Sequence, residues 1–475
     1  MQIKKLGFVG LTAIVFGSMI GSGIFNIPQN MSSVASVGAV MIAWVITAVG
    51  ILFLVSTFKI LSDRRPDLNA GIYQYAQEGF GNYLGFNIAW GYWLCTAFGN
   101  VAYGVMFNDS MGVFFPELLR HGWVSFAFGS ALIWTIFFIV TRGIRSASVI
   151  NTAITIMKIL SLILIVVLLV VLFDAGMFAR DFWGDGELGY GVAEQVKRTM
   201  LVTLWCFVGI EGAVSMSARA RRPSDVGRAG VFGFILAWVL YVLVSVLAFG
   251  VMQRAQMSSL ENPSVAYLLK EVCGEWAYYF VLISIICSLA GGWIAWTLIC
   301  TQVPFEAAVV KIFPRQFTRL NRHGMPAYGL CVSSVAMQVF FMIVLMSDSV
   351  YMAAIQVTSM MVLPAYLFSG IFLWKATRDK ERYLHVKKDA VMVRYRLTGI
   401  VCTVFCLWFM YAGGLLLLLS TSLFYLPGTF FYMMARRQNA PGGDPAFTRG
   451  ELWGFTFLCA CCVASVILIS QGMVQ

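Results

Sequence analysis

The stretch GSMIGSGIFNIP, residues 17–28, puts three glycines, two serines and a proline into a segment with no charged residue between Lys5 and Lys59. In hydrocarbon, an unpaired backbone N–H or C=O costs several kcal/mol, so an irregular backbone persists there only where it lines a cavity and finds partners. An interrupted helix offers free N–H groups that suit a carboxylate and free carbonyls that suit an ammonium. These are the two backbone charges of an amino acid.

A second interruption lies in TLWCFVGIEGAVSMS, residues 203–217, where Gly209 and Gly212 flank Glu211. Close helix packing through small residues, such as Gly17 and Gly21, is the alternative explanation for the first stretch alone. Two interrupted helices at corresponding positions instead favour a transporter built from an inverted repeat, with its binding site at the bilayer midplane.

Two ionisable residues fall inside predicted spans, where a charge costs at least a few kcal/mol and indicates a function. Glu211 has three candidate roles: it attracts a cationic substrate, accepts a proton, or pairs with a buried donor. The sequence modestly favours the first role. Lys158 falls within the fifth span, and whether it titrates is left open.

Patterns typical of soluble catalytic sites are missing from the sequence, which has no HExxH, P-loop, nucleophile elbow or zinc cluster. We therefore expect no enzyme activity, no cofactor and no metal. A membrane-embedded enzyme or receptor is the alternative class, and a protein that binds its ligand without flux would be a receptor.

Composition indicates the elements that must position these residues. The 475 residues are 60% hydrophobic and 12% charged, and the mean hydropathy is +0.81. So much apolar surface requires lipid as solvent, which predicts an all-α polytopic membrane protein. Apolar segments predict thirteen spans, or twelve if Tyr411–Gly414 does not separate two of them, near residues 6–30, 36–60, 84–114, 123–141, 147–173, 196–216, 229–252, 276–308, 328–347, 352–374, 397–412, 414–434 and 452–472.

Basic residues predict the orientation. With a cytoplasmic N-terminus, the inner loops collect 26 of the 33 Lys and Arg residues, as the positive-inside rule requires. The same rule explains the net charge of +11 without nucleic acid, and the basic loops can contact anionic lipid. The outer loops are weakly acidic, which either concentrates cationic solutes or reflects ordinary solvated charges.

Four longer segments occur in a familiar order: GSMIGSGIF, NAGIYQYAQEGFGNYLGF, TRGIRSASVINTAITIMKI and TLWCFVGIEGAVSMSARARRPSDVGRA. Over nearly its whole length the chain resembles the amino acid–polyamine–organocation superfamily, and within it the basic amino acid/polyamine antiporters that include arginine–ornithine and arginine–agmatine exchangers. The resemblance implies a five-plus-five inverted repeat with broken helices 1 and 6, in a multi-pass protein of the bacterial inner membrane.

The resemblance also implies a set of substrate-binding residues. The first break would hold the substrate carboxylate and amino group, and the sixth span would supply an aromatic gate and amine-binding carbonyls. The third span would add side-chain contacts, and an eighth-span tryptophan would stack on the cationic end of the substrate. By motif position these residues are Met19, Ile20, Ser22 and Gly23; Trp205, Cys206 and Val208; Tyr92, Cys95, Thr96 and Asn100; and Trp296, with Trp293 as its rival.

Gating and coupling residues follow from the same resemblance. Tyr73 matches an outer-gate tyrosine, and Lys158 lies where sodium-coupled relatives of this fold bind a cation, which argues against sodium coupling. Cys206 departs from the family pattern, because arginine–agmatine members have serine there, and this weakens the transfer of their substrate identity.

We expect an exchanger that swaps a cationic amino acid for its metabolic product, with a proton-coupled amino acid symporter as the alternative. The expected partners are small amino acids or amines and the lipid bilayer, and the sequence leaves a homodimer open. The predicted divisions are residues 1–175 for the first repeat, 196–375 for the second repeat and 396–475 for the C-terminal spans.

Overall fold

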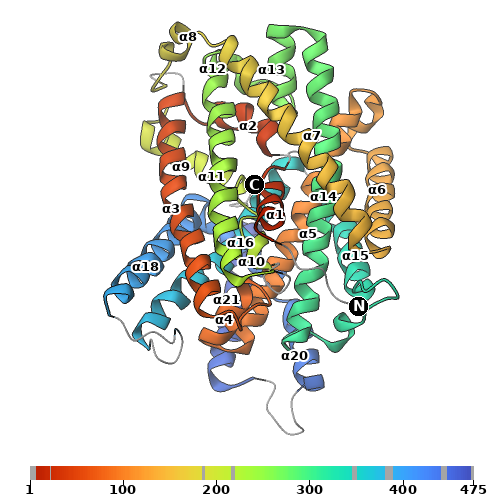
Figure 1. The fold of residues 1–475 in the computed structure, drawn as a ribbon, viewed down its shortest axis with the longest axis vertical. Coiled ribbons are helices and arrows are strands. Elements are labelled where there is room, and N and C mark those ends of the chain that lie inside the picture. Colours follow the sequence, from red (N-terminus) through yellow and green to blue (C-terminus); the bar gives the residue numbers. More distant parts are fainter. Residues whose placement is uncertain are drawn as a thin grey trace.

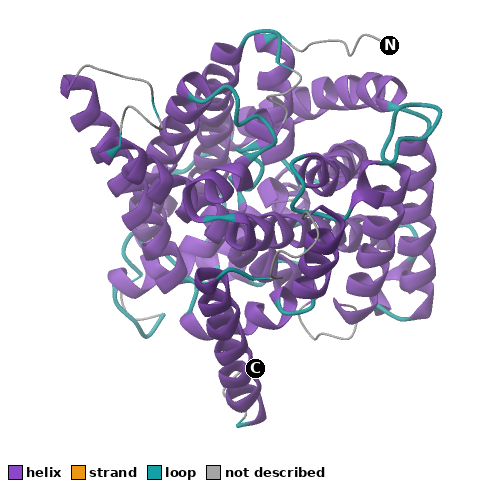
Figure 2. Ribbon diagram, turned by 90° about the horizontal axis from the view of Figure 1, so that it is seen from below, coloured by secondary structure: helices purple, strands orange, loops and turns teal. Residues whose placement is uncertain are grey.

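A computed structural model describes residues 7–21, 23–184, 188–215, 220–344, 350–379, 384, 389–439 and 447–471. Throughout these residues the regular structure is helical and contains no strand (Figure 2). The expected all-α fold is confirmed.

The first repeat of the fold begins with an interrupted helix pair and continues with four long helices, and a short helix precedes the third span. The helices are α1 (Phe8–Met19), α2 (Gly23–Ser32), α3 (Val37–Arg64), α4 (Ile72–Phe80), α5 (Asn82–Gly112), η1 (Pro116–Arg120), α6 (Trp123–Thr141) and α7 (Ile144–Val171). The short helix α8 (Ala175–Arg180) follows in the connection to the second repeat.

The second repeat has a similar order of elements, with two short helices in place of one before its third span. Its helices are α9 (Val192–Trp205), α10 (Gly212–Ser215), α11 (Pro223–Ala248), α12 (Arg254–Ser258), α13 (Ser264–Cys273), α14 (Glu275–Val309), η3 (Arg315–Thr318), α15 (Ala327–Val344) and α16 (Val350–Arg378). The C-terminal helices are α18 (Asp389–Ala412), α19 (Leu415–Tyr425), α20 (Gly428–Asn439) and α21 (Arg449–Ser470).

Helix lengths show the repeat directly. After the broken pair, the long helices of the first half have 28, 31, 19 and 28 residues, and those of the second half have 26, 35, 18 and 29. Because each half crosses the membrane an odd number of times, the second half starts on the opposite side and its topology is inverted. The residue boundaries of the three divisions stay a prediction.

Fewer of the described helices are both long and strongly apolar than the thirteen spans that the sequence predicts. Eight of the described helices are long and apolar enough to cross a membrane, and two bent pairs, α1 with α2 and α19 with α20, raise the number to ten. The other expected spans correspond to α5, to α9 with α10, and to α15. Most residues of α5 are buried within the protein, so α5 does not need an apolar surface. The expected interruption between the eleventh and twelfth spans lies at Gly414, with φ +95°.

Two hydrogen bonds join residues that the predicted spans place on the same side of the membrane. At one end of the bundle, Arg64 of α3 contacts Tyr395 of α18, and Lys375 of α16 donates to the carbonyl of Gly79 in α4. All four residues belong to connections or helix ends that the sequence assigns to one side.

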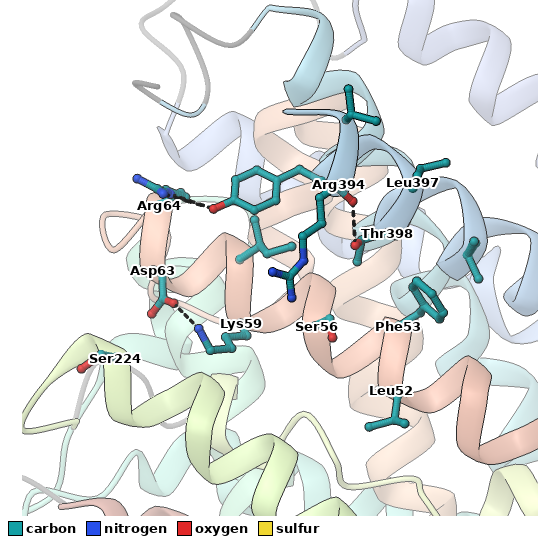
Figure 3. Close-up of a pocket in the computed structure, with 14 residues that line it drawn as sticks. Leu52, Phe53, Ser56, Lys59, Asp63, Arg64, Ser224, Arg394, Leu397 and Thr398 are labelled. Carbon is teal, nitrogen blue, oxygen red and sulfur yellow. Dashed lines mark hydrogen bonds and ion pairs between the residues drawn. The ribbon is translucent and has the colours of Figure 1, made fainter. Parts of the chain in front are cut away.

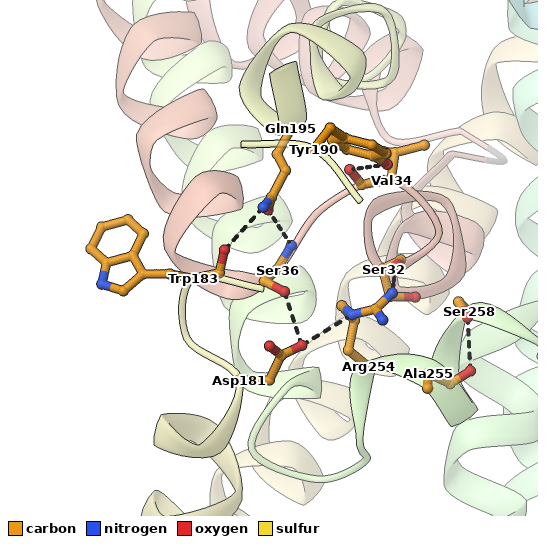
Figure 4. Close-up of polar contacts among 10 residues, drawn as sticks. All are labelled: Ser32, Val34, Ser36, Asp181, Trp183, Tyr190, Gln195, Arg254, Ala255 and Ser258. Carbon is orange, nitrogen blue, oxygen red and sulfur yellow. Dashed lines mark hydrogen bonds and ion pairs between the residues drawn. The ribbon is translucent and has the colours of Figure 1, made fainter. Parts of the chain in front are cut away.

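The opposite end holds a polar network around Asp181 (Figure 4). The Asp181 carboxylate accepts hydrogen bonds from Ser36 Oγ at 3.1 Å and from the Arg254 guanidinium at 3.1 Å. Arg254 also donates to the carbonyl of Ser32 at the end of α2, at 3.2 Å. The network therefore ties α2 to α12 and to the segment after α8.

The helices α1, α2 and α10 lie near the middle of the bundle, and α9 lies beside α3 (Figure 1). The helix α1 packs against α11, α10 and α14. Side chains of α11 and α14, Tyr241 and Trp296, reach the first interruption.

Candidate functional site

The first interruption begins after Met19, where Ile20 and Gly21 leave the helix, and α2 starts at Gly23. Ser22 lies outside the described residues. Three consecutive carbonyls at this break, those of Ser18, Met19 and Ile20, each accept a hydrogen bond from a side chain on a different helix. These bonds run from Trp296 Nε1 to Ser18 O (3.0 Å), from Tyr241 Oη to Met19 O (2.8 Å) and from Lys158 Nζ to Ile20 O (2.5 Å).

The second interruption spans residues 206–211, between α9 and α10. Gly209 there has φ +110°, a conformation that favours glycine. A Cβ at Gly209 would also lie 3.0 Å from the backbone of Ser18. The hydroxyl of Ser18 donates to the carbonyl of Gly209 at 2.8 Å, so the two interruptions are bonded to each other.

Glu211 closes the second interruption and is fully buried. Its carboxylate accepts hydrogen bonds from Tyr92 Oη of α5 at 2.7 Å, from Tyr366 Oη of α16 at 2.5 Å and from the backbone N–H of Gly209 at 3.1 Å. Of the three roles considered from the sequence, this geometry favours pairing with buried donors.

A cavity of about 10 Å³ lies between the interruptions, which is room for about one water molecule. Its lining residues come from α1, α2, α5, α9, α14 and the two interruptions, and are Ser18, Met19, Gly21, Gly23, Tyr103, Trp205, Val208 and Trp296. A bound amino acid therefore requires the aromatic rings of Trp205 or Trp296 to move.

Five of the predicted substrate-binding residues line this cavity: Met19, Gly23, Trp205, Val208 and Trp296. Ile20 contributes through its carbonyl, which contacts Lys158. The predicted third-span residues and Cys206 are buried but do not line the cavity. Their polar groups form hydrogen bonds within the protein: Tyr92 donates to Glu211, Thr96 to the carbonyl of Trp93 and Cys206 to the carbonyl of Val202, and Asn100 accepts from Thr297. Cys95 is fully buried.

The two candidate tryptophans of α14 point to different places. Trp296 lines the cavity, whereas the ring of Trp293 lies against Phe107, with ring centroids 6.4 Å apart, and near Gly104. The structure therefore brings Trp296 to the interruptions.

Three site residues were missed by sequence reasoning. Tyr103 fills the space that Gly21 leaves, because a Cβ at Gly21 would lie 2.1 Å from Tyr103 Oη. Tyr241 and Tyr366 hold the Met19 carbonyl and the Glu211 carboxylate. Only Tyr103 had a sequence signal, since it lies about one helical turn beyond Asn100 on the predicted third span.

Tyr73 lies away from the cavity, on α4. It is buried, and its hydroxyl is 3.5 Å from the carbonyl of Val303 in α14. It thus joins the short helix α4 to the end of the eighth span.

Comparison with known proteins gives consistent results. The family model described as amino acid permease matches residues 6–436. The chain is 41% identical to an arginine/agmatine antiporter of Chlamydia pneumoniae, over 99% of this chain and 98% of the relative. It is also 41% identical to an arginine/agmatine antiporter of Chlamydia trachomatis serovar L2, over the full length of both.

A third relative is a putative amino-acid transporter of Clostridium perfringens, which is 38% identical over 94% of this chain and 95% of the relative. Among solved structures, the crystal structure of MhsT in complex with L-phenylalanine aligns with a TM-score of 0.61 at 11% identity, over 87% of this chain and all of that chain. This likeness concerns the fold alone.

Substitutions at Glu211 test its hydrogen bonds. In Glu211→Gln, the amide oxygen still accepts from Tyr366 and Gly209, and the hydroxyl of Tyr92 turns to accept from the amide NH₂. Glu211→Leu leaves three donors without a partner, at roughly 1–3 kcal/mol for each. We expect the thermal midpoint of the purified protein to stay near wild type for Gln and to fall for Leu. Equal midpoints for the two variants would contradict this assignment.

Proposed function

This chain belongs to the amino acid permease family, and we propose that it is an antiporter that exchanges arginine for agmatine by alternating access. The observation that carries the proposal is the pair of interrupted helices that face each other across one cavity. The full-length relatives named arginine/agmatine antiporters support the choice of substrates. They give no support for ornithine, which we therefore replace by agmatine as the exchanged product.

The site has a group for each end of arginine. The N-terminus of α2 begins at Gly23 beside the cavity, and free N–H groups at a helix N-terminus favour a carboxylate. The faces of Trp205 and Trp296 are suited to a guanidinium, which aromatic rings attract by a cation–π interaction. Agmatine shares the guanidinium and lacks the carboxylate, so the aromatic end would serve both substrates.

Alternating access needs a closure on each side of the cavity. Tyr92 lies nearer the N-terminal end of α5 than the cavity residue Tyr103, and the two are well separated because the helix rises by about 1.5 Å per residue. With a cytoplasmic N-terminus of the chain, this end of α5 is the inner end. We therefore assign the cluster of Glu211, Tyr92 and Tyr366 to the inner closure. The Asp181 network belongs to the outer closure (Figure 4).

Lys158 supports exchange without sodium. Its side-chain nitrogen donates to the carbonyl of Ile20 at the first interruption, and when Lys158 is protonated a positive charge occupies the position beside this carbonyl. A sodium ion at this carbonyl would meet electrostatic repulsion from the ammonium.

We propose a bacterial inner membrane as the location, with the N-terminus in the cytoplasm, on the basis of the positive-inside rule. Under this orientation Tyr73 belongs to the cytoplasmic end, together with Arg64 and Gly79, so its gating role would be at the inner side and not the outer side. The homodimer that the sequence leaves open remains a prediction.

Exchange in proteoliposomes tests the function. Vesicles loaded with arginine should take up labelled agmatine, and empty vesicles should not, because an antiporter needs substrate on both sides. Uptake into empty vesicles driven by a pH gradient would favour the proton-coupled symporter instead. Binding of arginine without flux in either assay would indicate a receptor.

Replacing the tryptophans of α14 tests the cationic end of the site. Trp296→Leu should weaken arginine binding by roughly 1–2 kcal/mol, or about 5- to 30-fold, which is the scale of a desolvated cation–π contact. Trp293→Leu is the matched control on the same helix, and its ring lies outside the cavity. A larger loss of affinity for Trp293→Leu than for Trp296→Leu would reverse the assignment.

Small substitutions at two glycines test the carboxylate end. A Cβ at Gly23 would lie 3.0 Å from Trp205, whereas a Cβ at Gly17 would make an ordinary 3.8 Å contact with Thr155. Gly23→Ala should therefore lower arginine affinity by about tenfold, or roughly 1.4 kcal/mol, and Gly17→Ala should leave it unchanged. Isothermal titration of both variants measures this, and equal affinities would remove Gly23 from the site.

A further inference from the structure

A groove far larger than the central cavity opens between α3 and α18 and reaches the start of α11 at Ser224 (Figure 3). Its volume is about 1340 Å³, which exceeds the range of about 300–1,000 Å³ that is typical of small-molecule pockets. None of the residues assigned to substrate binding or gating lines it.

Polarity changes along the groove. Its end near Arg64 carries three cations and one carboxylate, namely Lys59, Arg64, Arg394 and Asp63. The other end is apolar and is formed by Leu52, Phe53, Leu397 and Val401. From Leu52 to Arg64, α3 rises about 18 Å at about 1.5 Å per residue. This length matches one leaflet, since half of the hydrocarbon core is about 15 Å.

The cations at the polar end are available to a ligand. Arg64 donates to the neutral hydroxyl of Tyr395 at 3.1 Å and 3.2 Å. Lys59 pairs with Asp63 at 2.8 Å, but both side chains are partly exposed. Arg394 is exposed and reaches from α18 toward α3 (Figure 3), and no ion pair of its guanidinium occurs among the described residues. The polar end therefore keeps a net positive charge.

The apolar side of the groove faces outward from the bundle. Leu397 and Val393 are 55% and 60% exposed on α18, and Leu52 is 38% exposed on α3. Toward the apolar end, α18 touches α3, because the ring of Phe405 occupies the space next to Gly50 and a Cβ there would lie 1.9 Å from it. The groove is thus a wedge that is open to lipid along its side.

We propose that this groove binds one anionic phospholipid of the cytoplasmic leaflet. The phosphate would lie among Lys59, Arg64 and Arg394, and the acyl chains would run along the apolar residues of α3 and α18 toward Phe405. A basic pocket between transmembrane helices that continues into an apolar slot is suited to such a headgroup. A second copy of the chain fits less well, since a symmetric contact would bring the same cations together.

Lipid titration of the purified full-length protein, followed by native mass spectrometry, tests this proposal. Phosphatidylglycerol should bind with one high-affinity site, and phosphatidylcholine with the same acyl chains should bind more weakly. The double variant Arg64→Gln/Arg394→Gln should lower phosphatidylglycerol affinity by about fivefold for each charge removed. The control Arg319→Gln/Arg322→Gln removes the same charge outside the groove, on the same side of the membrane, and should bind as wild type.

Two further experiments distinguish a bound phospholipid from free phosphate and from a second copy of the chain. Ser56→Phe, which fills the middle of the groove without a change in charge, should lower the affinity for both lipids. Glycerol 3-phosphate should not displace phosphatidylglycerol, and displacement at similar concentrations would show a site for free phosphate. An equal loss of phosphatidylglycerol affinity in the Arg319→Gln/Arg322→Gln control would overturn the proposed site. A change from dimer to monomer in the groove variants, without a change in bound lipid, would show that a second copy covers the groove.

Discussion

Three consecutive carbonyls at the end of α1 determine how the centre of this protein is built. Ser18, Met19 and Ile20 lie where the helix stops, and inside a membrane each carbonyl without a partner would cost several kcal/mol. Side chains from α14, α11 and α7 each donate to one of them. The interruption that opens backbone groups to a ligand is therefore the same feature that holds three distant helices in register around the site.

The second interruption depends on the first. Gly209 accepts a hydrogen bond from Ser18 and approaches it so closely that a Cβ would lie 3.0 Å from the Ser18 backbone. Glu211 then accepts from the backbone of Gly209 and from two tyrosines, which connects the break to α5 and α16. Because these groups are satisfied within the protein and the cavity holds little more than a water molecule, the structure represents a closed state in which substrate groups would have to take over existing hydrogen bonds.

Much of this arrangement could be predicted from the sequence. The glycine-rich breaks and the repeat follow from motifs that are local in the chain, and the choice of Trp296 over Trp293 rested on the family resemblance. The partners Tyr241 and Tyr366 could not be predicted, because which hydroxyl reaches a free carbonyl or carboxylate depends on how the helices pack. For the same reason Asn100 and Thr96, which belong to a binding motif, instead bond to neighbouring protein groups. The apolar segment at residues 84–114 predicted α5 as a span, although its mean hydropathy is lower than that of the eight most apolar helices, since most of its residues are buried in protein.

The central claim is that the backbone groups of the two interruptions form the substrate site. An experimental structure of the protein with bound arginine tests this claim most directly. The account predicts the arginine carboxylate at the N-terminus of α2, with its guanidinium against Trp205 or Trp296 and at least one of these rings moved from its position in the closed state. Arginine bound elsewhere, with the central cavity unchanged, would contradict it.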